Sequence, residues 1–247
     1  MALQPKFSII TITYNASSVI RPTLDSVLSQ SYHNYEYILV DGGSSDDTVA
    51  IAKASGINFA HIVSERDKGI YDAMNKGIAL ATGDYLCFLN AGDAFYAPDT
   101  LQTIVDAIAE EKVLPDVLYG ETAVVDAERN FVRMRRLQAP KELNWRSFKN
   151  GMLVCHQAFY ARREIAPMYN LKYRLSSDVD WCIKVMKRAK KMVNVNAVVV
   201  NYLQNGLSLQ HHRKSLMERF CVMSNHYGVL PTIGYHIWFI LRAVIKK

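Results

Sequence analysis

The run Phe7-Ser-Ile-Ile-Thr-Ile-Thr13 is rich in apolar and β-branched residues and contains no charge. Such a run is typical of a strand that is buried on both faces of a parallel sheet. The residues that follow carry apolar side chains at helical spacing, namely Val19, Ile20, Leu24, Val27 and Leu28. We expect Asn15 or Ser17 to cap this helix. The chain therefore opens with a strand followed by a helix.

The same alternation continues through the first half of the chain. Its pattern predicts strands at residues 35–40, 61–64 and 85–89, and helices from Asp46 to about residue 55 and over 70–81. Strands that alternate with helices indicate βαβ units, so the fold class is α/β with a mostly parallel central sheet flanked by helices. Such sheets bind ligands beyond the carboxyl ends of their strands.

The second half is less regular. We expect strands at 117–119, 122–125, 131–135, 155–160 and 192–202, and a helix at 178–189. No internal repeat or low-complexity linker precedes residue 205. The sequence predicts one domain over residues 1–205 and a helical C-terminal extension over 206–247.

Composition and charge exclude several classes of protein. The 247 residues are 50% apolar and 21% charged, with a net charge of +6, as in an ordinary globular protein. The aromatic residues are not interleaved with the basic runs and no nucleic-acid motif is present, so we expect no nucleic-acid partner. The first strand is followed by Thr13-Tyr-Asn-Ala-Ser-Ser18 rather than by GxGxxG, which argues against a dinucleotide-dependent oxidoreductase.

The four cysteines lie far apart, without a CxxC pair, so neither a zinc site nor a disulfide framework is predicted. Buried free thiols in a reducing compartment are the simplest interpretation. The first residues lack a charged segment followed by a signal-type apolar region. We therefore expect a cytoplasmic location.

Five stretches, in this order, resemble the family 2 glycosyltransferases of the GT-A fold. They are Ser8-Ile-Ile-Thr-Ile-Thr-Tyr-Asn15, Tyr37-Ile-Leu-Val-Asp-Gly-Gly-Ser-Ser-Asp-Asp-Thr48, Ser64-Glu-Arg-Asp-Lys-Gly-Ile-Tyr-Asp-Ala-Met-Asn-Lys-Gly77, Gly83-Asp-Tyr-Leu-Cys-Phe-Leu-Asn-Ala-Gly-Asp93 and Ser177-Asp-Val-Asp-Trp181. The resemblance extends from residue 6 to about 200. It implies a GT-A fold and the transfer of a sugar from a nucleotide-sugar donor, a UDP-sugar first of all, to a hydroxyl acceptor.

The resemblance also implies the donor site. Thr13, Tyr14 and Asp41 map to the positions that hold the nucleoside, and Asp67 maps beside the ribose or base. A tyrosine offers a face to a base, and a carboxylate can accept an N–H of uracil. Read without the resemblance, the same residues make a helix cap and a turn.

The segment Asn90-Ala-Gly-Asp93 stands where the family carries its Asp-x-Asp element, which holds a divalent cation on the diphosphate. Asn90 and Gly92 replace acidic residues, so they are assigned to the nucleotide sugar, and Asp93 is the remaining candidate ligand for Mn²⁺ or Mg²⁺. The substitutions put the metal requirement in doubt, and a simple turn is the alternative.

Asp178 maps to the general base of the family members that invert the anomeric centre. It would take the proton from the acceptor hydroxyl as that oxygen attacks the sugar. The alternative is that Ser176, Ser177 and Asp178 only cap a helix, and that Asp180 interacts with its dipole. A non-catalytic nucleotide-sugar-binding module is the competing function, because two usual acids are missing. The presence of Asp178 argues against it.

The last residues, 230–247, are apolar with aromatics and a basic end, but fall short of the ~20 apolar residues of a membrane span. They suit an interfacial helix with Trp238 and Phe239 among lipid headgroups, or a helix packed on the domain or in a homodimer. The membrane interpretation fits an enzyme at the inner face of the cell membrane that acts on a saccharide or lipid-linked acceptor in surface polysaccharide or glycolipid synthesis.

Overall fold

The computed structural model describes residues 3–204 and 212–245. One sheet forms the centre, in the order β3-β2-β1-β4-β8-β6-β9-β5, with β7 paired to β6. Its strands are β1 (Phe7–Thr13), β2 (Tyr35–Asp41), β3 (His61–Ser64), β4 (Tyr85–Phe88), β5 (Ala94–Phe95), β6 (Val117–Val125), β7 (Phe131–Met134), β8 (Phe159–Arg162) and β9 (Met192–Leu203).

The strands of this sheet mostly share one direction. β1 pairs in parallel with β2 and β4, β2 with β3, and β6 with β9. Because β8 is antiparallel to both β4 and β6, the strands β4 and β6 also run the same way. Only β5, β7 and β8 run in the opposite direction among the described strands. The α/β fold with a mostly parallel sheet is confirmed.

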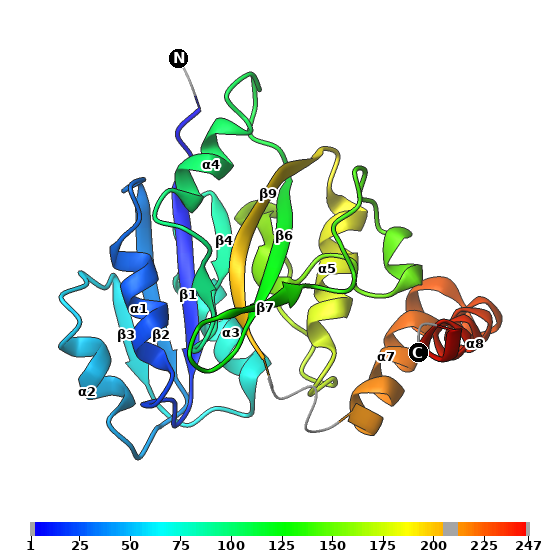
Figure 1. Cartoon of the computed structure of the whole chain (residues 1–247), viewed down its shortest axis with the longest axis horizontal. Coiled ribbons are helices and arrows are strands. Elements are labelled where there is room, and N and C mark those ends of the chain that lie inside the picture. The colour runs from blue at the N-terminus through cyan, green and yellow to red at the C-terminus, as the bar shows by residue number, and fades with distance from the viewer. Residues whose placement is uncertain (1–2, 205–211, 246–247) are drawn as a thin grey trace.

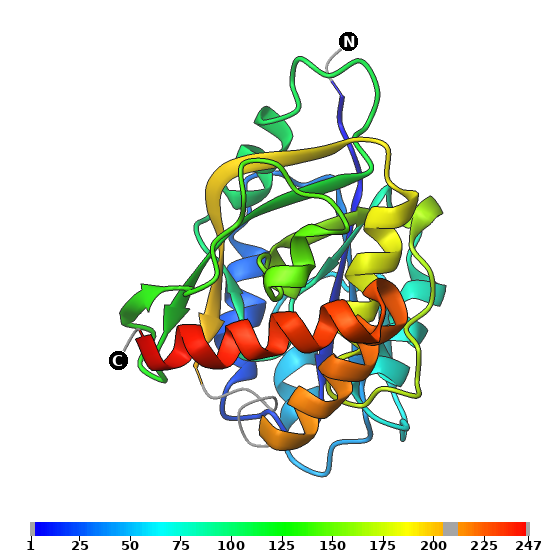
Figure 2. The same cartoon turned by 90° about the vertical axis from the view of Figure 1, so that its right-hand side faces the viewer.

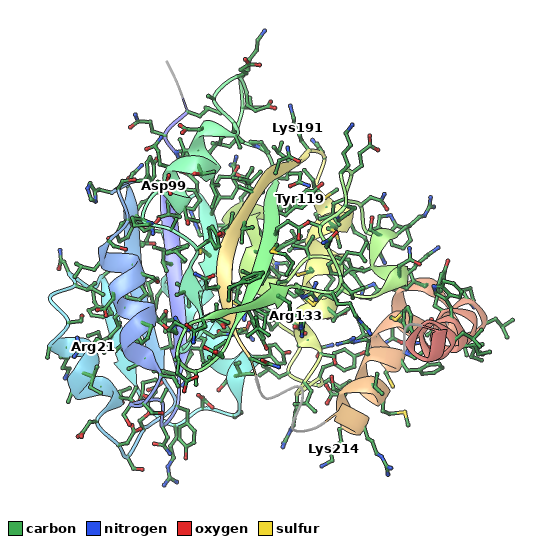
Figure 3. All side chains as sticks on the ribbon, viewed as in Figure 1. Arg21, Asp99, Tyr119, Arg133, Lys191 and Lys214 are labelled. Atoms are coloured by element: carbon green, nitrogen blue, oxygen red, sulfur yellow. The ribbon has the colours of Figure 1, made fainter. Side chains whose placement is uncertain are left out.

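Helices cover both faces of the sheet. α1 lies on one face, while α3 and α5 lie on the other (Figures 1 and 2). The helices are α1 (Ile20–Leu28), α2 (Thr48–Lys53), α3 (Ile70–Leu80), α4 (Thr100–Asp106), α5 (Ser177–Arg188), α7 (His212–Tyr227) and α8 (Val229–Ile245), with short 3-10 helices at η1 (Ser147–Asn150), η2 (His156–Ala158) and η3 (Arg163–Ile165). Every residue of β1 is buried, as its apolar run predicts.

The C-terminal helices lie on one side of the sheet. α7 contacts α5, and its Val222 is fully buried within the same core as the strands. α8 lies across the outer edge of the molecule and packs on α7 and η1 (Figure 2). No helix of the described ranges, 3–204 and 212–245, has the length and apolarity needed to cross a membrane.

Several local predictions are wrong. Neither Asn15 nor Ser17 caps α1, which begins after Val19 without a side-chain cap. Asn15 instead takes a left-handed conformation (φ 47°), and its side-chain oxygen accepts a hydrogen bond from the Ser45 backbone N–H. Asparagine tolerates this region better than most residues. A contact between two loops thus replaces the expected local cap.

Four further predictions need correction. The strand expected at 155–160 is a 3-10 turn followed by β8, and the two strands expected at 117–119 and 122–125 are one strand, β6. Leu28 is half exposed rather than part of the buried helix stripe, because it lies at the last residue of α1. Cys221 is exposed on α7, while the other three thiols are buried.

Candidate active site

The carboxyl ends of the parallel strands form the lower edge of the sheet in Figure 1. Thr13 and Asp41 are register partners at the ends of β1 and β2, and Asp41 is paired in turn with Ser64 at the end of β3. The Asp41 carboxylate is fully buried and accepts hydrogen bonds from Gly43 N (3.1 Å), Ser44 N (2.9 Å) and Ser64 Oγ (2.7 Å). Asp41 therefore fixes the turn that follows β2.

This turn brings Tyr14 and Asp67, two predicted site residues, to Gly42. A Cβ atom on Gly42 would lie 2.5 Å from Asp67 Oδ2 and 3.4 Å from the ring of Tyr14. Tyr14 is 66% exposed, and Asp67 Oδ1 accepts a hydrogen bond from Gly69 N at 2.8 Å. The absence of a side chain at Gly42 leaves the space into which the Asp67 carboxylate fits. The Tyr14 ring and the Asp67 carboxylate thus both border Gly42, and their assignment to a nucleoside stays a prediction.

Two buried oxygen atoms near this edge have no hydrogen-bond partner among the described residues. They are Thr13 Oγ1, at the end of β1, and Asn90 Oδ1, which follows the neighbouring strand β4. Buried polar atoms are nearly always hydrogen-bonded in folded proteins. A bound group that supplies donors or a cation would satisfy these two atoms.

Asp93 is almost completely buried. Its Oδ2 accepts a hydrogen bond from Gln157 Nε2 (2.7 Å) and its Oδ1 accepts one from Leu203 N (3.0 Å). Burial raises the pKa of this carboxyl to about 7, while the two hydrogen bonds and the charge of Arg129 act in the opposite direction. Arg129 reaches the same turn and donates to the Gly92 carbonyl at 2.6 Å. Asp93 thus joins the end of β4 to the end of β9.

Asp178 lies in the first turn of α5. Its Oδ1 accepts hydrogen bonds from the Tyr71 hydroxyl (3.1 Å) and from Val179 N (2.9 Å). Within the described residues both recorded bonds of this carboxylate go to Oδ1, so Oδ2 can accept a proton or a hydrogen bond from a substrate. Tyr71 lies in the first turn of α3 (Ile70–Leu80), so the start of α3, which follows Asp67 closely in the chain, supplies the partner of Asp178.

A stack of rings supports this carboxylate. Tyr71 stacks on Tyr169 (5.5 Å between centroids), and Tyr169 stacks on Trp181 (5.0 Å). His156 Nε2 and the Tyr169 hydroxyl share a hydrogen bond of 2.5 Å, and the His156 ring lies against Phe88. His156 is buried and holds these rings together through its contacts. Burial also raises the pKa of the Tyr71 hydroxyl, which keeps it a neutral donor.

The other acidic residue of α5 has a different role. Asp180 pairs with Lys184 (2.6 Å), one turn further along α5, and with His226 Nε2 (2.7 Å) on α7. Asp180 therefore forms an ion pair within α5, and its contact with His226 joins α5 to α7. In the described ranges no cluster of three or more His, Cys, Asp or Glu side chains could hold a metal ion by itself.

Comparison with known proteins assigns the family. Residues 8–166, well over half of the chain, match the pattern described as Glycosyl transferase family 2. The chain belongs to glycosyltransferase family 2. It is a glycosyltransferase, and the predicted resemblance is confirmed.

Relatives extend the similarity to the full length. A PGL/p-HBAD biosynthesis glycosyltransferase of Mycobacterium bovis is 36% identical, covering 98% of this chain and 95% of that protein. The amylovoran biosynthesis glycosyltransferase AmsB of Erwinia amylovora is 30% identical over 79% of this chain and 69% of that protein. The crystal structure of residues 1–349 of S. aureus TarS superimposes with a TM-score of 0.71 at 17% identity, covering 95% of this chain and 72% of that chain. The TarS likeness confirms the GT-A fold.

Sequence reasoning missed Tyr71 and Gln157 as partners of the site. Tyr71 stands within a quoted family stretch and Gln157 within the strand expected at 155–160, but nothing in the local pattern connects them to Asp178 or Asp93.

We expect the buried His156 to make stability depend on pH. Burial lowers its pKa from 6.5 to about 4, so the unfolded chain takes up a proton that the folded chain refuses between these values. The contribution of His156 to the free energy of unfolding should be fully present above pH 6.5. It should fall as the pH decreases towards 4, by up to about 1.4 kcal/mol per pH unit. Urea unfolding of the wild type and of His156→Gln at several pH values checks this. Equal pH slopes for the two proteins would contradict it.

Proposed function

We propose that this glycosyltransferase moves a sugar from a UDP-sugar to a hydroxyl of a saccharide or lipid-linked acceptor, with inversion at the anomeric carbon. The observation that carries the proposal is the Asp178 carboxylate, one oxygen of which is held by Tyr71 and the Val179 N–H while the other can face a substrate. A fixed carboxylate at the carboxyl edge of the sheet is what a general base for an attacking hydroxyl requires.

The donor half of the proposal rests on Tyr14, Gly42 and Asp67. The exposed ring of Tyr14 can stack on a base, and the Asp67 carboxylate can accept hydrogen bonds from the ribose or base. The unpartnered Thr13 Oγ1 and the turn held by Asp41 complete this side. A crystal structure of TarS in complex with UDP-GlcNAc, which has a TM-score of 0.67 to this chain over 81% of its length, supports a UDP-sugar as the donor class.

The residues at Asn90–Asp93 fit a divalent cation. Each carboxylate oxygen of Asp93 accepts one recorded hydrogen bond, so lone pairs remain, and Asn90 Oδ1 has no partner in the described part of the chain. Mg²⁺ and Mn²⁺ use few protein oxygens and complete their shell with water and substrate phosphates. We propose that Asp93, with Asn90 and the Gly92 turn beside it, would hold such an ion. When bound, it would offset the negative charge that develops on the departing diphosphate.

In the proposed reaction the acceptor oxygen attacks the anomeric carbon as Asp178 accepts its proton. The bond from the anomeric carbon to the phosphate oxygen breaks, and the nucleoside diphosphate leaves with the electron pair. Attack opposite the leaving group inverts the configuration, and no covalent intermediate on the protein is required. The task of this chain is to hold both reactants and the carboxylate in line.

The first test measures hydrolysis and transfer from a panel of UDP-, GDP- and dTDP-sugars with Mn²⁺, Mg²⁺ or EDTA, using a lipid-linked acceptor extract as well as water. We expect one donor to be turned over, turnover to be lost with EDTA, and Asp178→Asn to reduce kcat by about 10²–10⁴-fold while UDP binding is retained. Tight UDP binding without turnover of any donor would favour the non-catalytic nucleotide-sugar-binding module.

A second variant separates donor binding from catalysis. Gly42→Ala places a methyl group where the Asp67 carboxylate now lies, so we expect the Kd for UDP to rise about tenfold while kcat at saturating donor changes little. Isothermal titration with UDP and steady-state kinetics measure the two effects. The assignment of Tyr14 and Asp67 to the nucleoside would be wrong if Gly42→Ala bound UDP as the wild type does.

We also propose that the chain divides into a transferase domain, residues 1–205, and a helical extension, 206–247, that touches the inner face of the cell membrane. α8 exposes a stripe of large apolar side chains at helical spacing, namely Leu230, Ile233, Ile237, Trp238 and Leu241. Such a stripe, with tryptophan among aliphatic residues, suits the headgroup boundary of a bilayer. Lys246 and Lys247, which the sequence placed on anionic lipid, lie outside the described residues.

Cosedimentation with vesicles of phosphatidylglycerol and phosphatidylcholine tests the membrane contact. We expect the wild type to bind, Ile237→Asp to lose most of this binding, and Leu28→Asp, which changes an equally exposed leucine on α1, to bind as the wild type does. Light scattering without lipid distinguishes the alternative. A dimer that Ile237→Asp dissociates would assign the stripe to a second copy instead.

A further inference from the structure

The N-terminal end of α5 is held by a carboxylate from another helix. Glu218, on α7, accepts hydrogen bonds from three consecutive backbone N–H groups: Arg174 N (3.1 Å), Leu175 N (2.7 Å) and Ser176 N (3.1 Å). These residues immediately precede α5, and Asp178 follows Ser176 by two positions. Glu218 lies 42 residues beyond Ser176 in the chain.

This arrangement replaces a local helix cap. The N-cap residue Ser176 makes no side-chain cap bond, and its hydroxyl instead donates to the Ser215 carbonyl of α7 at 3.2 Å. A carboxylate near the first turn of a helix is favoured both by the free N–H groups and by the helix dipole. Hydrogen bonds to a charged group are also stronger than neutral ones. The conformation of the segment leading into Asp178 is thus set by α7.

Other contacts from α7 converge on the same segment. Asn225 donates to the Tyr173 hydroxyl at 2.7 Å, and His226 pairs with Asp180 at 2.7 Å. These two bonds lie on either side of the backbone that Glu218 holds. They dock α7 on α5, whereas Glu218 is the α7 side chain that bonds to the backbone directly before Asp178.

We infer that Glu218 is a positioning residue for the proton-accepting carboxylate: it holds residues 174–176 so that Asp178 meets the acceptor hydroxyl and Tyr71 together. This inference rests on the proposed function in taking Asp178 as the base. A misplacement of a reacting group by about 1 Å can cost about 10²-fold in rate. α7 therefore contributes to catalysis through backbone geometry, without touching the substrate.

The test compares Glu218→Gln with the wild type in two measurements. Hydrogen exchange should accelerate at the amides of Arg174, Leu175 and Ser176, because a neutral amide cannot accept three N–H groups as the carboxylate does. With the UDP-sugar identified by the donor panel, kcat should fall about 10-fold to 100-fold. The Kd for UDP should stay unchanged, because Tyr14, Gly42 and Asp67 lie on other elements. Glu218→Asp, which keeps the charge but withdraws it by one methylene, should give a smaller loss of kcat.

Asp180→Asn is the matched control, because it breaks the other carboxylate contact between α5 and α7 and leaves the three N–H groups bound. It should keep a higher kcat than Glu218→Gln when the two variants unfold at the same urea concentration. Equal losses of kcat in these two variants would show that Glu218 acts only by docking α7 on α5, and this result would overturn the inference. Unchanged exchange at the three amides would overturn it as well, even if the wild type turned over no donor and the proposed function failed on its own.

Discussion

The parallel pairing of β1 with β2 on one side and β4 on the other is the constraint from which the candidate site follows. This pairing places the residues after three strands at one edge, so that Thr13, Asp41 and the Asn90–Asp93 turn are neighbours although they are far apart in the chain. Strands β3 and β4 run parallel but are separated by β2 and β1, so the chain between them must cross one face of the sheet. This crossover contains α3, which carries Tyr71. The same pairing that buries β1 therefore brings the partner of Asp178 to the site.

The candidate site carries charges of both signs, because Arg66 lies against Gly43 and Arg129 donates to the Gly92 carbonyl beside four carboxyl groups. Asp41, Asp67, Asp93 and Asp178 all contribute carboxyl groups near the position proposed for a nucleoside diphosphate, itself an anion. Asp41 accepts hydrogen bonds from local N–H and hydroxyl donors. Within the described ranges, the groups that favour the charged form of Asp93 against its burial are Gln157, the Leu203 N–H and the charge of Arg129. The pKa of Asp93, raised to about 7 by burial, marks a carboxyl that is short of positive charge. A cation between Asp93 and a diphosphate would supply positive charge to both anionic groups. This electrostatic argument is the physical reason to expect a metal although Asn90 and Gly92 replace acidic residues.

The sequence predicted elements well where a local pattern decides them. β1 and β3 have the expected bounds. For β1 the reason is an uninterrupted run of apolar and β-branched residues, all of which are buried in the sheet. Predictions that relied on local hydrogen bonds were less accurate. Asn15 was expected to cap a helix and instead bonds to Ser45, 30 residues away. The strand expected at 155–160 failed because its apolar residues are buried by a 3-10 turn, which periodicity over so short a run does not distinguish from a strand.

The residues around Gly42 and those around Asp178 also differ in how far a local sequence pattern predicts them. The proposed donor side is built from turns that stand in recognisable stretches of sequence, and the structure brings Tyr14, Asp41 and Asp67 to the turn after β2. Their assignment to the donor stays a prediction. The base side depends on contacts across long separations: Tyr71 and Asp178 are 107 residues apart, Asp93 and Gln157 are 64, and Glu218 and Ser176 are 42. No local spacing in the sequence predicts such pairs, because only the folded chain brings the two residues together. The segments that surround the base also belong to the less regular second half of the chain. Under the proposed function, substitutions in α7 or in the loop before α5 would therefore alter the surroundings of Asp178 and leave the turns around Gly42 unchanged.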